Sequence, residues 1–366
     1  MQKRWIYFAI LGIGGISLVR STVGQGTDFL VFWKAGRALL ESQPIYQVAQ
    51  DGGMVFKYPP WIAPLFIPFA LFSFEVAKWL WGMFCVLCMA GIFSILERKL
   101  KVKTTVWAPL AIFYWGLWVI HALDGQIILP LLFFGLWAVT ANRTRAWIDA
   151  FVPLTYSAKV FTVYPIAFVL KRFSKLKVAL ISVLFALGLS GITAVQSFHG
   201  DAFRMFHDWK EAAASGGKFL AEGQTRGAKN QSLTSFVCRS LSIPADDTRS
   251  EVAVALVLFV IAFWVFSRRM RSMNETQKFL VGLALTPVFH PLPWHHLHLW
   301  TFPLAAYALN RRRTFLLFLS LFLITLSSER AFGWIEALRP FGHFLEWNVG
   351  RAWGALLLAW VATESE

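Results

Sequence analysis

The organisation of this chain turns on one amphipathic stretch, DFLVFWKAGRALL, which occupies residues 28–40. It follows an opening hydrophobic span of about 20 residues, Trp5 to Gln25, and Asp28 is the first charge beyond that span. A carboxylate at the mouth of a membrane helix is costly to bury, so it usually serves as a helix cap or as a functional group. We predict an amphipathic helix over 28–41 that lies near the extracytoplasmic face of the membrane, with Thr27 or Asp28 as its N-cap.

The composition is that of an all-α polytopic membrane protein. Of the 366 residues, 57% are hydrophobic and only 15% are charged, and the mean hydropathy is +0.55. A soluble chain of this length would need more charge on its surface. Aromatic residues reach 16%, which suits lipid-facing and interfacial positions. The three cysteines form no disulfide framework, because Cys85 and Cys88 lie in an apolar run and Cys238 stands alone.

The net charge of +15 does not indicate a nucleic-acid partner, because the basic residues form short clusters that lie between the apolar runs. If all the basic clusters face the cytoplasm, the chain has one consistent topology with both termini inside. The clusters are Lys3-Arg4, Arg98 to Lys103, Arg143 and Arg145, Lys171 to Lys177, Arg268 to Arg271, and Arg311 to Arg313.

Two segments of the predicted path do not read as simple spans. Residues 59–74 contain four prolines, which disfavour a straight helix, so we interpret 26–74 as the first extracytoplasmic loop with juxtamembrane or re-entrant helices. Residues 146–170 carry Lys159 between apolar runs of about 12 residues each, which favours two half-length or tilted helices turning around Lys159.

The other apolar runs predict ordinary spans, at 75–96, 105–121, 126–141, 178–198, 251–267, 277–289, 299–309, 314–328 and 350–363. The total is about twelve transmembrane or half-membrane helices, in one integral membrane domain over 1–366. Residues 199–249 form a long extracytoplasmic loop, and 329–349 stay outside. No internal repeat is evident, so an inverted-repeat transporter is not supported.

The polar residues that could take part in binding or catalysis lie on the predicted outer side. No cytoplasmic loop exceeds roughly ten residues, and the Gly12, Gly14 and Gly15 cluster lacks the strand and helix context of a phosphate loop. The protein therefore has no place for a nucleotide-binding domain, and a lipid-linked activated donor would suit an enzyme here. The outer polar residues are Asp28, Lys57, Tyr58, Asp124, Gln126, Gln231, Arg239, His290, His295 and His296.

The order and spacing of these motifs resemble a known family. The motifs are Asp28-Phe29, Tyr46, Phe56 to Pro60, Gly125-Gln126, Lys159, Asn230 to Ser232 with Arg239, and Trp294 to His296. The chain resembles the polyprenol-phosphate-mannose-dependent mannosyltransferases of glycosyltransferase family 87, which have the superfamily C fold. Two departures are Lys159-Val160, where the family usually has Lys-Pro, and Thr286-Pro287 with an inserted His290 to Pro293 before the Trp/His motif.

The resemblance implies an inverting transfer of mannose from polyprenyl-phosphate-mannose to a membrane-associated glycolipid or glycan, which forms an α-mannoside on the extracytoplasmic face of the cell inner membrane. It implies no cofactor and no metal. Asp28 would be the catalytic base, and Lys159, Arg239, His295 and His296 would bind the donor phosphate in one cavity opposite Asp28. The sugar- and acceptor-binding residues would be Lys57, Tyr58, Gln126, Gln231 and Trp294.

Each residue also has a structural interpretation. Asp28 can be only a helix cap, Gln126 can cap its own span, and Asp124 can cap the next helix. Lys159 can snorkel to the cytoplasmic interface, and Arg239 can pair with Asp246 or Asp247. The histidines His290, His295, His296 and His298 have a spacing that allows a metal site.

At the level of function, a lipid or sugar transporter or flippase stays the alternative to the enzyme. The identity of the acceptor, the choice of mannose over another polyprenyl-linked sugar, and the oligomeric state stay open.

Overall fold

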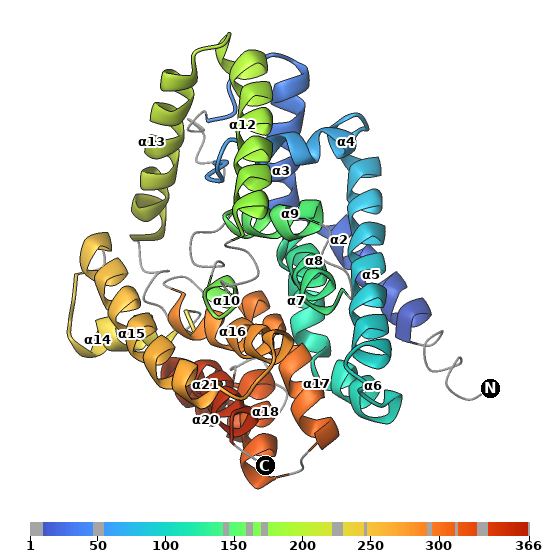
Figure 1. Cartoon of the computed structure of the whole chain (residues 1–366), viewed down its shortest axis with the longest axis vertical. Coiled ribbons are helices and arrows are strands. Elements are labelled where there is room, and N and C mark those ends of the chain that lie inside the picture. The colour runs from blue at the N-terminus through green and yellow to red at the C-terminus, as the bar shows by residue number, and fades with distance from the viewer. Residues whose placement is uncertain are drawn as a thin grey trace. The chain divides into compact units, whose positions relative to one another are not determined.

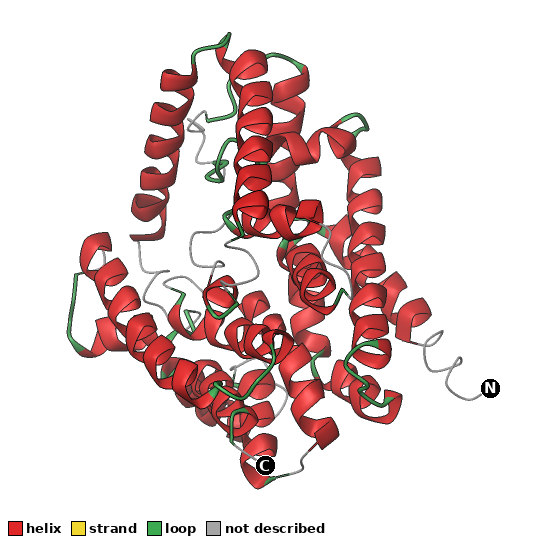
Figure 2. Cartoon of the chain, viewed as in Figure 1, coloured by secondary structure: helices red, strands yellow, loops and turns green. Residues whose placement is uncertain are grey.

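The structure is a computed structural model that describes residues 10–46, 55–141, 146–158, 164–169, 175–221, 230–244, 247–290, 295–311, 314–327 and 336–364. Every regular element in these ranges is helical, as Figure 2 shows. This agrees with the all-α class that the composition predicts.

The chain divides into two compact units whose segments interleave along the sequence. Unit 1 comprises Met1–Gly91, Val119–Val160 and Lys171–Phe219, and unit 2 comprises Ile92–Trp118, Phe161–Leu170 and Leu220–Glu366. Helices α5 (Phe74–Arg98) and α7 (Trp115–Asp124) each begin in one unit and end in the other.

Unit 1 contains the amphipathic helix predicted for residues 28–41. Its other elements include a proline-broken segment and the long helix α12, which are labelled in Figure 1. They are η1 (Ile10–Gly14), α2 (Gly15–Gly24), α3 (Thr27–Leu40), η2 (Ala63–Phe66), α4 (Ile67–Ala70), most of α5, α8 (Ile128–Thr140), α9 (Ala146–Tyr156), α12 (Leu176–Phe198) and α13 (Ala202–Ala221).

An aromatic cluster fixes α3 against the start of α5 in unit 1. The ring of Phe29 stacks on Trp81 at 5.1 Å between centroids, and the ring of Phe32 stacks on Phe66 at 4.5 Å. Both phenylalanines are fully buried, so one face of α3 is an apolar contact surface. The prolines of 59–74 limit this segment to two four-residue helices, η2 and α4, which confirms that it is no straight helix.

Unit 2 is built around α16, whose residues Phe279–Phe289 are all buried. Its other elements are α6 (Thr104–Phe113), α10 (Tyr164–Ala167), α14 (Leu233–Ser240), α15 (Thr248–Arg269), η4 (His295–Thr301), α17 (Phe302–Arg311), α18 (Phe315–Leu326), η5 (Glu336–Leu338), α20 (Arg339–Trp347) and α21 (Gly350–Ala362).

Glycines let two pairs of segments approach closely in unit 2. A Cβ atom on Gly354 would lie 2.7 Å from the Ser320 carbonyl oxygen of α18, and one on Gly282 would lie 2.7 Å from the Pro165 Cα of α10. Larger residues at either position would push the helices apart.

Three described helices are long and apolar enough to cross a membrane, namely Phe74–Arg98, Leu176–Phe198 and Arg249–Arg269. A fourth span results if the bent pair α6 and α7 crosses as one. Helices α8, α18 and α21 are apolar but shorter. At about 1.5 Å per residue, a 13-residue helix falls short of a hydrocarbon core of about 30 Å. The count of about twelve crossings therefore stays a prediction.

One predicted span is not a single straight helix. Residues 105–121 form two helices, α6 and α7, that meet at Tyr114 with a bend of 59°. Pro109 lies inside α6 and lacks the N–H that would bond back to residue 105, so it affects the turn before it and does not account for the bend at Tyr114. The predicted loop 199–249 also contains regular structure, since α13, α14 and the start of α15 occupy most of it.

Candidate active site

The start of α3 is set by a glycine rather than by a polar cap. Gly26 is the N-cap and has the left-handed backbone angles φ 54° and ψ 37°, with no side-chain cap bond. A Cβ atom here would lie 2.8 Å from the Thr22 carbonyl oxygen, so the tight α2–α3 junction requires glycine. The prediction that Thr27 or Asp28 caps this helix is wrong, because Asp28 lies inside the first turn.

The Gly125-Gln126 turn between α7 and α8 packs against this junction. The Gly26 N–H donates to the Leu123 carbonyl at 2.9 Å, and the Trp81 indole donates to the Gly125 carbonyl at 3.1 Å. Gly125 has φ +68°, and a Cβ atom on it would lie 2.7 Å from the Phe29 Cβ. Gln126, which is buried, is thereby held beside the residue that follows Asp28.

Neither Asp124 nor Gln126 occupies the N-cap position of α8. The N-cap of α8 is Ile127, which makes no side-chain cap bond. Instead the Leu129 N–H of the first turn donates to the His121 Nε2 at 3.1 Å. A residue of the preceding helix therefore satisfies one backbone N–H at the start of α8.

Side chains from three other segments hold the Lys57-Tyr58 backbone. The Tyr46 hydroxyl donates to the Tyr58 carbonyl at 3.0 Å, and the Trp209 indole donates to the Lys57 carbonyl at 3.2 Å. Thr193 donates to the Pro60 carbonyl at 2.8 Å. These bonds fix the loop although it has no regular structure of its own.

Asp28, Lys57 and Tyr58 lie within electrostatic reach of one another in unit 1. Burial raises the pKa of the Tyr58 hydroxyl, and the negative charge of Asp28 raises it further. Burial lowers the pKa of Lys57, and the Asp28 carboxylate opposes that shift. All three residues are half-buried. The loop and the start of α3 thus bring together a carboxylate, an ammonium and a neutral phenol.

In unit 2, Gln231 is fully buried and its amide contacts backbone groups. The Nε2 group donates to the Glu346 carbonyl, and the Oε1 atom accepts from the Arg351 N–H at 3.4 Å. Ser232 next to it caps α14 by accepting from the Ser235 N–H. Gln231 therefore links the entry of α14 to the start of α21.

Arg239 lies in the last turn of α14 and is held in place by two side-chain bonds. Its guanidinium donates to the Ser235 hydroxyl at 2.9 Å and to the Trp347 carbonyl at 2.7 Å. The group also lies 5.2 Å from the centroid of the Trp347 ring. Asp247, one suggested partner of Arg239, caps α15 by accepting from the Ser250 N–H, and Asp246 is outside the described residues.

The histidines belong to η4 and differ in environment. The His295 Nε2 lies 3.8 Å from the Glu346 carboxylate, and His296 is buried. His298 is fully buried, and neither ring nitrogen has a partner among the described residues. Burial and the charge of Arg351 lower the pKa of His298, which keeps its imidazole neutral.

Two charged residues of unit 2, Glu346 and Arg351, are not among the candidate residues that the sequence predicts. Arg351 begins α21 and is only 3% exposed. Its Nε donates to the Ser327 carbonyl at 3.3 Å, and its Nη1 has no partner among the described residues. The available signal was a charge at the edge of the apolar run 350–363. A charge at that place also fits the edge of a span, because a sequence does not show that α21 buries its first turn.

Lys159 and Trp294 lie outside the described residues. Asp28, Lys57, Tyr58 and Gln126 belong to unit 1, whereas Gln231, Arg239, His295 and His296 belong to unit 2. The roles of all these residues, and the cavity that the phosphate site and Asp28 would share, stay predictions. The described residues that meet metal-ligand spacing are His207, Asp208 and Glu211, a largely exposed group on α13.

The sequence model of glycosyltransferase family 87 matches residues 56–291. The matched range includes Lys57, Tyr58, Gln126, Lys159, Gln231 and Arg239, but not Asp28, His295 or His296. A curated relative is the polyprenol-phosphate-mannose-dependent alpha-(1-2)-phosphatidylinositol pentamannoside mannosyltransferase of Mycobacterium tuberculosis (strain CDC 1551 / Oshkosh). It is 25% identical over an alignment of 333 residues, and the alignment covers 85% of this chain and 70% of the relative. No solved structure matches the chain.

Proposed function

Because the chain belongs to glycosyltransferase family 87, we propose that it moves mannose from polyprenyl-phosphate-mannose to a membrane-associated glycolipid or glycan. Membership of this family makes it an enzyme rather than the transporter that the sequence left as the alternative. The relative's name supports the donor. The basic clusters support an active site on the extracytoplasmic face of the cell inner membrane.

The observation that carries the proposal is the grouping of Asp28 with Lys57 and Tyr58 at the start of α3. The carboxylate lies in the first turn of α3, and Gly26 rather than Asp28 occupies the N-cap position. The positive end of the α3 dipole and the Lys57 ammonium both lie within electrostatic reach of this carboxylate. An ionised carboxylate is the form that accepts a proton from an acceptor hydroxyl.

In the proposed reaction the acceptor oxygen attacks C1 of the β-linked mannose from the face opposite the phosphate. The C1–O bond to the phosphate breaks, and its electron pair leaves with the polyprenyl phosphate. The hydroxyl proton passes to Asp28, and inversion at C1 gives an α-mannoside. Tyr58, which keeps its proton, offers a hydrogen bond and a flat ring to the sugar, and Lys57 and Gln126 offer further donors.

The leaving phosphate gains charge as the bond breaks and needs cations and hydrogen-bond donors near it. We assign this role to Lys159, Arg239, His295 and His296. The structure supports adding Glu346 and Arg351 as residues that position the group, since Glu346 faces His295 and Arg351 lies between Gln231 and Ser327. Gln231 then acts through the backbone it holds, while Trp294 keeps its proposed contact with the sugar.

Membranes containing the protein would be incubated with labelled polyprenyl-phosphate-mannose to test the function, and the lipid fractions would be separated. We expect label in a glycolipid fraction that an α-mannosidase releases. Membranes with the Asp28→Asn protein at equal abundance should show almost none. Label that crosses the membrane on an unchanged donor would contradict the proposal.

A further inference from the structure

Lys78 is a buried charge that the proposed mechanism does not use. It lies in the second turn of α5, a helix that is long and apolar enough to cross a membrane, and it is only 7% exposed. An ammonium group in such a segment is costly to bury unless it is paired, and it usually marks a functional site. The bonds that Lys78 makes therefore indicate its role.

The ammonium group of Lys78 bonds to the end of a different helix. Its Nζ donates to the Val23 carbonyl at 2.8 Å, and Val23 lies in the last turn of α2, where the carbonyl groups have no partner within their own helix. A cation at this end also interacts favourably with the helix dipole. The exposed Glu75 carboxylate pairs with the same ammonium at 3.0 Å. Lys78 is thus a cap for the carboxyl end of α2, supplied by α5.

The Lys78 side chain also lies beside the residue that begins α3. A Cβ atom on Gly26 would lie 3.4 Å from the Lys78 Cδ atom, which is ordinary van der Waals contact. Gly26 is the N-cap of α3 and precedes Asp28 by two residues. The stem of Lys78 therefore packs against the turn that leads into the proposed base, while its ammonium holds the end of the helix before that turn.

Two aromatic neighbours of Lys78 on α5 hold the first turn of α3. Phe74 is four residues before Lys78 and Trp81 is three residues after it, so the three side chains share one side of the helix. Both rings stack on Phe29, the residue after Asp28, at 6.2 and 5.1 Å between centroids. The Lys78 ammonium lies 4.9 Å from the centroid of the Phe74 ring. One side of α5 therefore contacts the chain both before and after Asp28.

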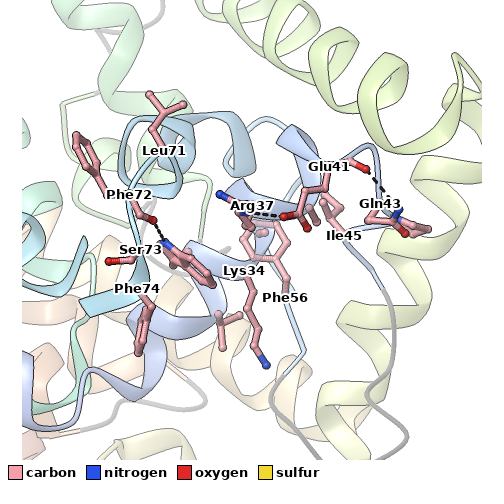
Figure 3. A pocket seen from close by; sticks show the side chains of 15 residues that line it. Lys34, Arg37, Glu41, Gln43, Ile45, Phe56, Leu71, Phe72, Ser73 and Phe74 are labelled. Carbon is pink, nitrogen blue, oxygen red and sulfur yellow. Dashed lines mark hydrogen bonds and ion pairs between the residues drawn. The ribbon is translucent and has the colours of Figure 1, made fainter. Parts of the chain in front are cut away.

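Further contacts keep the start of α5 against α3. The Trp33 indole donates to the Phe72 carbonyl at 3.2 Å, and its ring packs on Phe74 at 5.4 Å between centroids. Figure 3 shows Phe72 and Phe74 in the lining of a cavity of about 880 Å³ along α3. The turn before α5 is thus joined to α3, and Lys78 adds the link to α2. All of these residues belong to unit 1.

From these contacts we infer that Lys78 is a positioning residue, which holds the α2–α3 junction on α5 and thereby fixes the place of the Asp28 carboxylate. This inference rests on the proposed function, and it gives Lys78 no contact with substrate. Reacting groups must lie about 3–3.5 Å apart and be aligned, and a displacement of about 1 Å can lower a rate about a hundredfold. Loss of the bond to Val23 releases the end of α2 and moves Gly26 and, with it, Asp28.

Purified proteins in phosphatidylcholine nanodiscs would test the inference by two independent measurements. Initial rates of transfer from labelled polyprenyl-phosphate-mannose to octyl α-mannoside give kcat and a KM for each substrate. Hydrogen exchange of the backbone amides, followed by mass spectrometry, reports how firmly residues 24–30 are held, whether or not the protein is turning over. Lys78→Met removes the charge and the donor, Lys78→Arg keeps both, and Lys210→Met changes an exposed lysine on α13 as a control.

We expect Lys78→Met to lower kcat roughly 10- to 100-fold and to leave both KM values within about twofold, because the substrates still bind while the base is displaced. Exchange over residues 24–30 should become several-fold faster, with no change over α18. Lys78→Arg should restore most of kcat, and Lys210→Met should behave as wild type. In a protein that already carries Asp28→Asn, Lys78→Met should have little further effect on kcat, because both changes act through one carboxylate.

A wild-type kcat for Lys78→Met, or wild-type exchange over residues 24–30, would overturn the inference and leave the proposed function standing. Equal losses of kcat with and without Asp28→Asn would also overturn it, since Lys78 would then act independently of the base. If the wild type transfers no mannose, the proposed function fails, and the exchange experiment still decides whether Lys78 holds the junction. Thermal unfolding checks that each variant is folded, and Lys78→Gln, with a shorter uncharged donor, replaces Lys78→Met if that protein does not fold.

Discussion

Asp28 combines two features that a purely structural acid would not need. It lies in the first turn of a helix whose cap is Gly26, and its charge acts on both Lys57 and Tyr58. Glu75 occupies the first turn of α5, where its exposed carboxylate pairs with the buried Lys78 at 3.0 Å. The two residues therefore share a local position but differ in surroundings, which allows a matched comparison.

Asp28→Asn should lower the rate of mannose transfer by roughly 10²- to 10⁴-fold, because the amide oxygen is too weakly basic to take the acceptor proton. The free energy of unfolding should fall by only about 0.3–1 kcal/mol, which is the usual contribution of a negative charge in the first turn of a helix. Glu75→Gln should lose a similar amount of stability and no activity. Transfer of labelled mannose and thermal unfolding are measured for both variants. Near wild-type transfer by Asp28→Asn would show that Asp28 is not the catalytic base.

Glu346 links three parts of unit 2. Its carboxylate faces His295 at 3.8 Å, its carbonyl accepts from Gln231, and its charge acts on Arg351. A carboxylate at this place can orient the His295 ring toward a phosphate without touching substrate itself.

If Glu346 positions His295, Glu346→Gln should raise the donor KM several-fold and leave the acceptor KM unchanged. The same change in a His295→Ala background should have little further effect, since interacting residues are not additive. Glu336→Gln, an exposed acid in η5, is the control. Equal losses in both backgrounds would show that Glu346 acts on stability alone.

The turn between α7 and α8 positions the start of α3 through a single glycine. Gly125 combines φ +68° with a near contact to Phe29, whereas Gly200 has φ +88° and open space around its Cα. An alanine at either site costs about 1–2 kcal/mol of unfolding free energy for the left-handed backbone. Only at Gly125 does the new methyl group also displace a neighbour.

Gly125→Ala should therefore destabilise the protein more than Gly200→Ala, and it should also reduce mannose transfer by moving Phe29 and, with it, Asp28. Chemical unfolding and transfer assays on the two variants separate backbone strain from the contact. Equal stability losses, with activity retained in both, would show that the turn does not position α3.

The membrane topology is a property of the complete chain. The basic clusters predict a topology that puts Lys210 of α13 outside and Arg271 inside. The native cysteines Cys85, Cys88 and Cys238 are all buried, so labelling of the wild-type protein should be low. An impermeant thiol reagent applied from outside should react with Lys210→Cys and not with Arg271→Cys. The reverse pattern would place Asp28 on the cytoplasmic side and end the proposed mechanism.

Much of the helical structure follows from the sequence, because hydropathy, prolines and charge clusters act locally. The apolar runs predict α5, α8, α12, α15, α16, α18 and α21 to within a few residues, and the four prolines predict the broken segment after Tyr58. The bend at Tyr114 is not evident from the sequence, because Pro109, the one proline in residues 105–121, acts on the turn before it rather than on Tyr114. The family was also recognisable from motif order alone.

The sequence thus determined the membrane class, the helix positions, the family and the candidate residues. Only the tertiary structure decided that Gly26 rather than Asp28 starts α3, that His121 caps α8 from another helix, and that Glu346 and Arg351 join the histidines of η4. It also decided which side of α3 forms a cavity and that Lys78 of α5 bonds to the end of α2. Hydropathy and capping preferences depend on neighbours in the chain. A hydrogen bond, a buried charge and a cavity wall depend on neighbours in space, which separate segments provide only after folding.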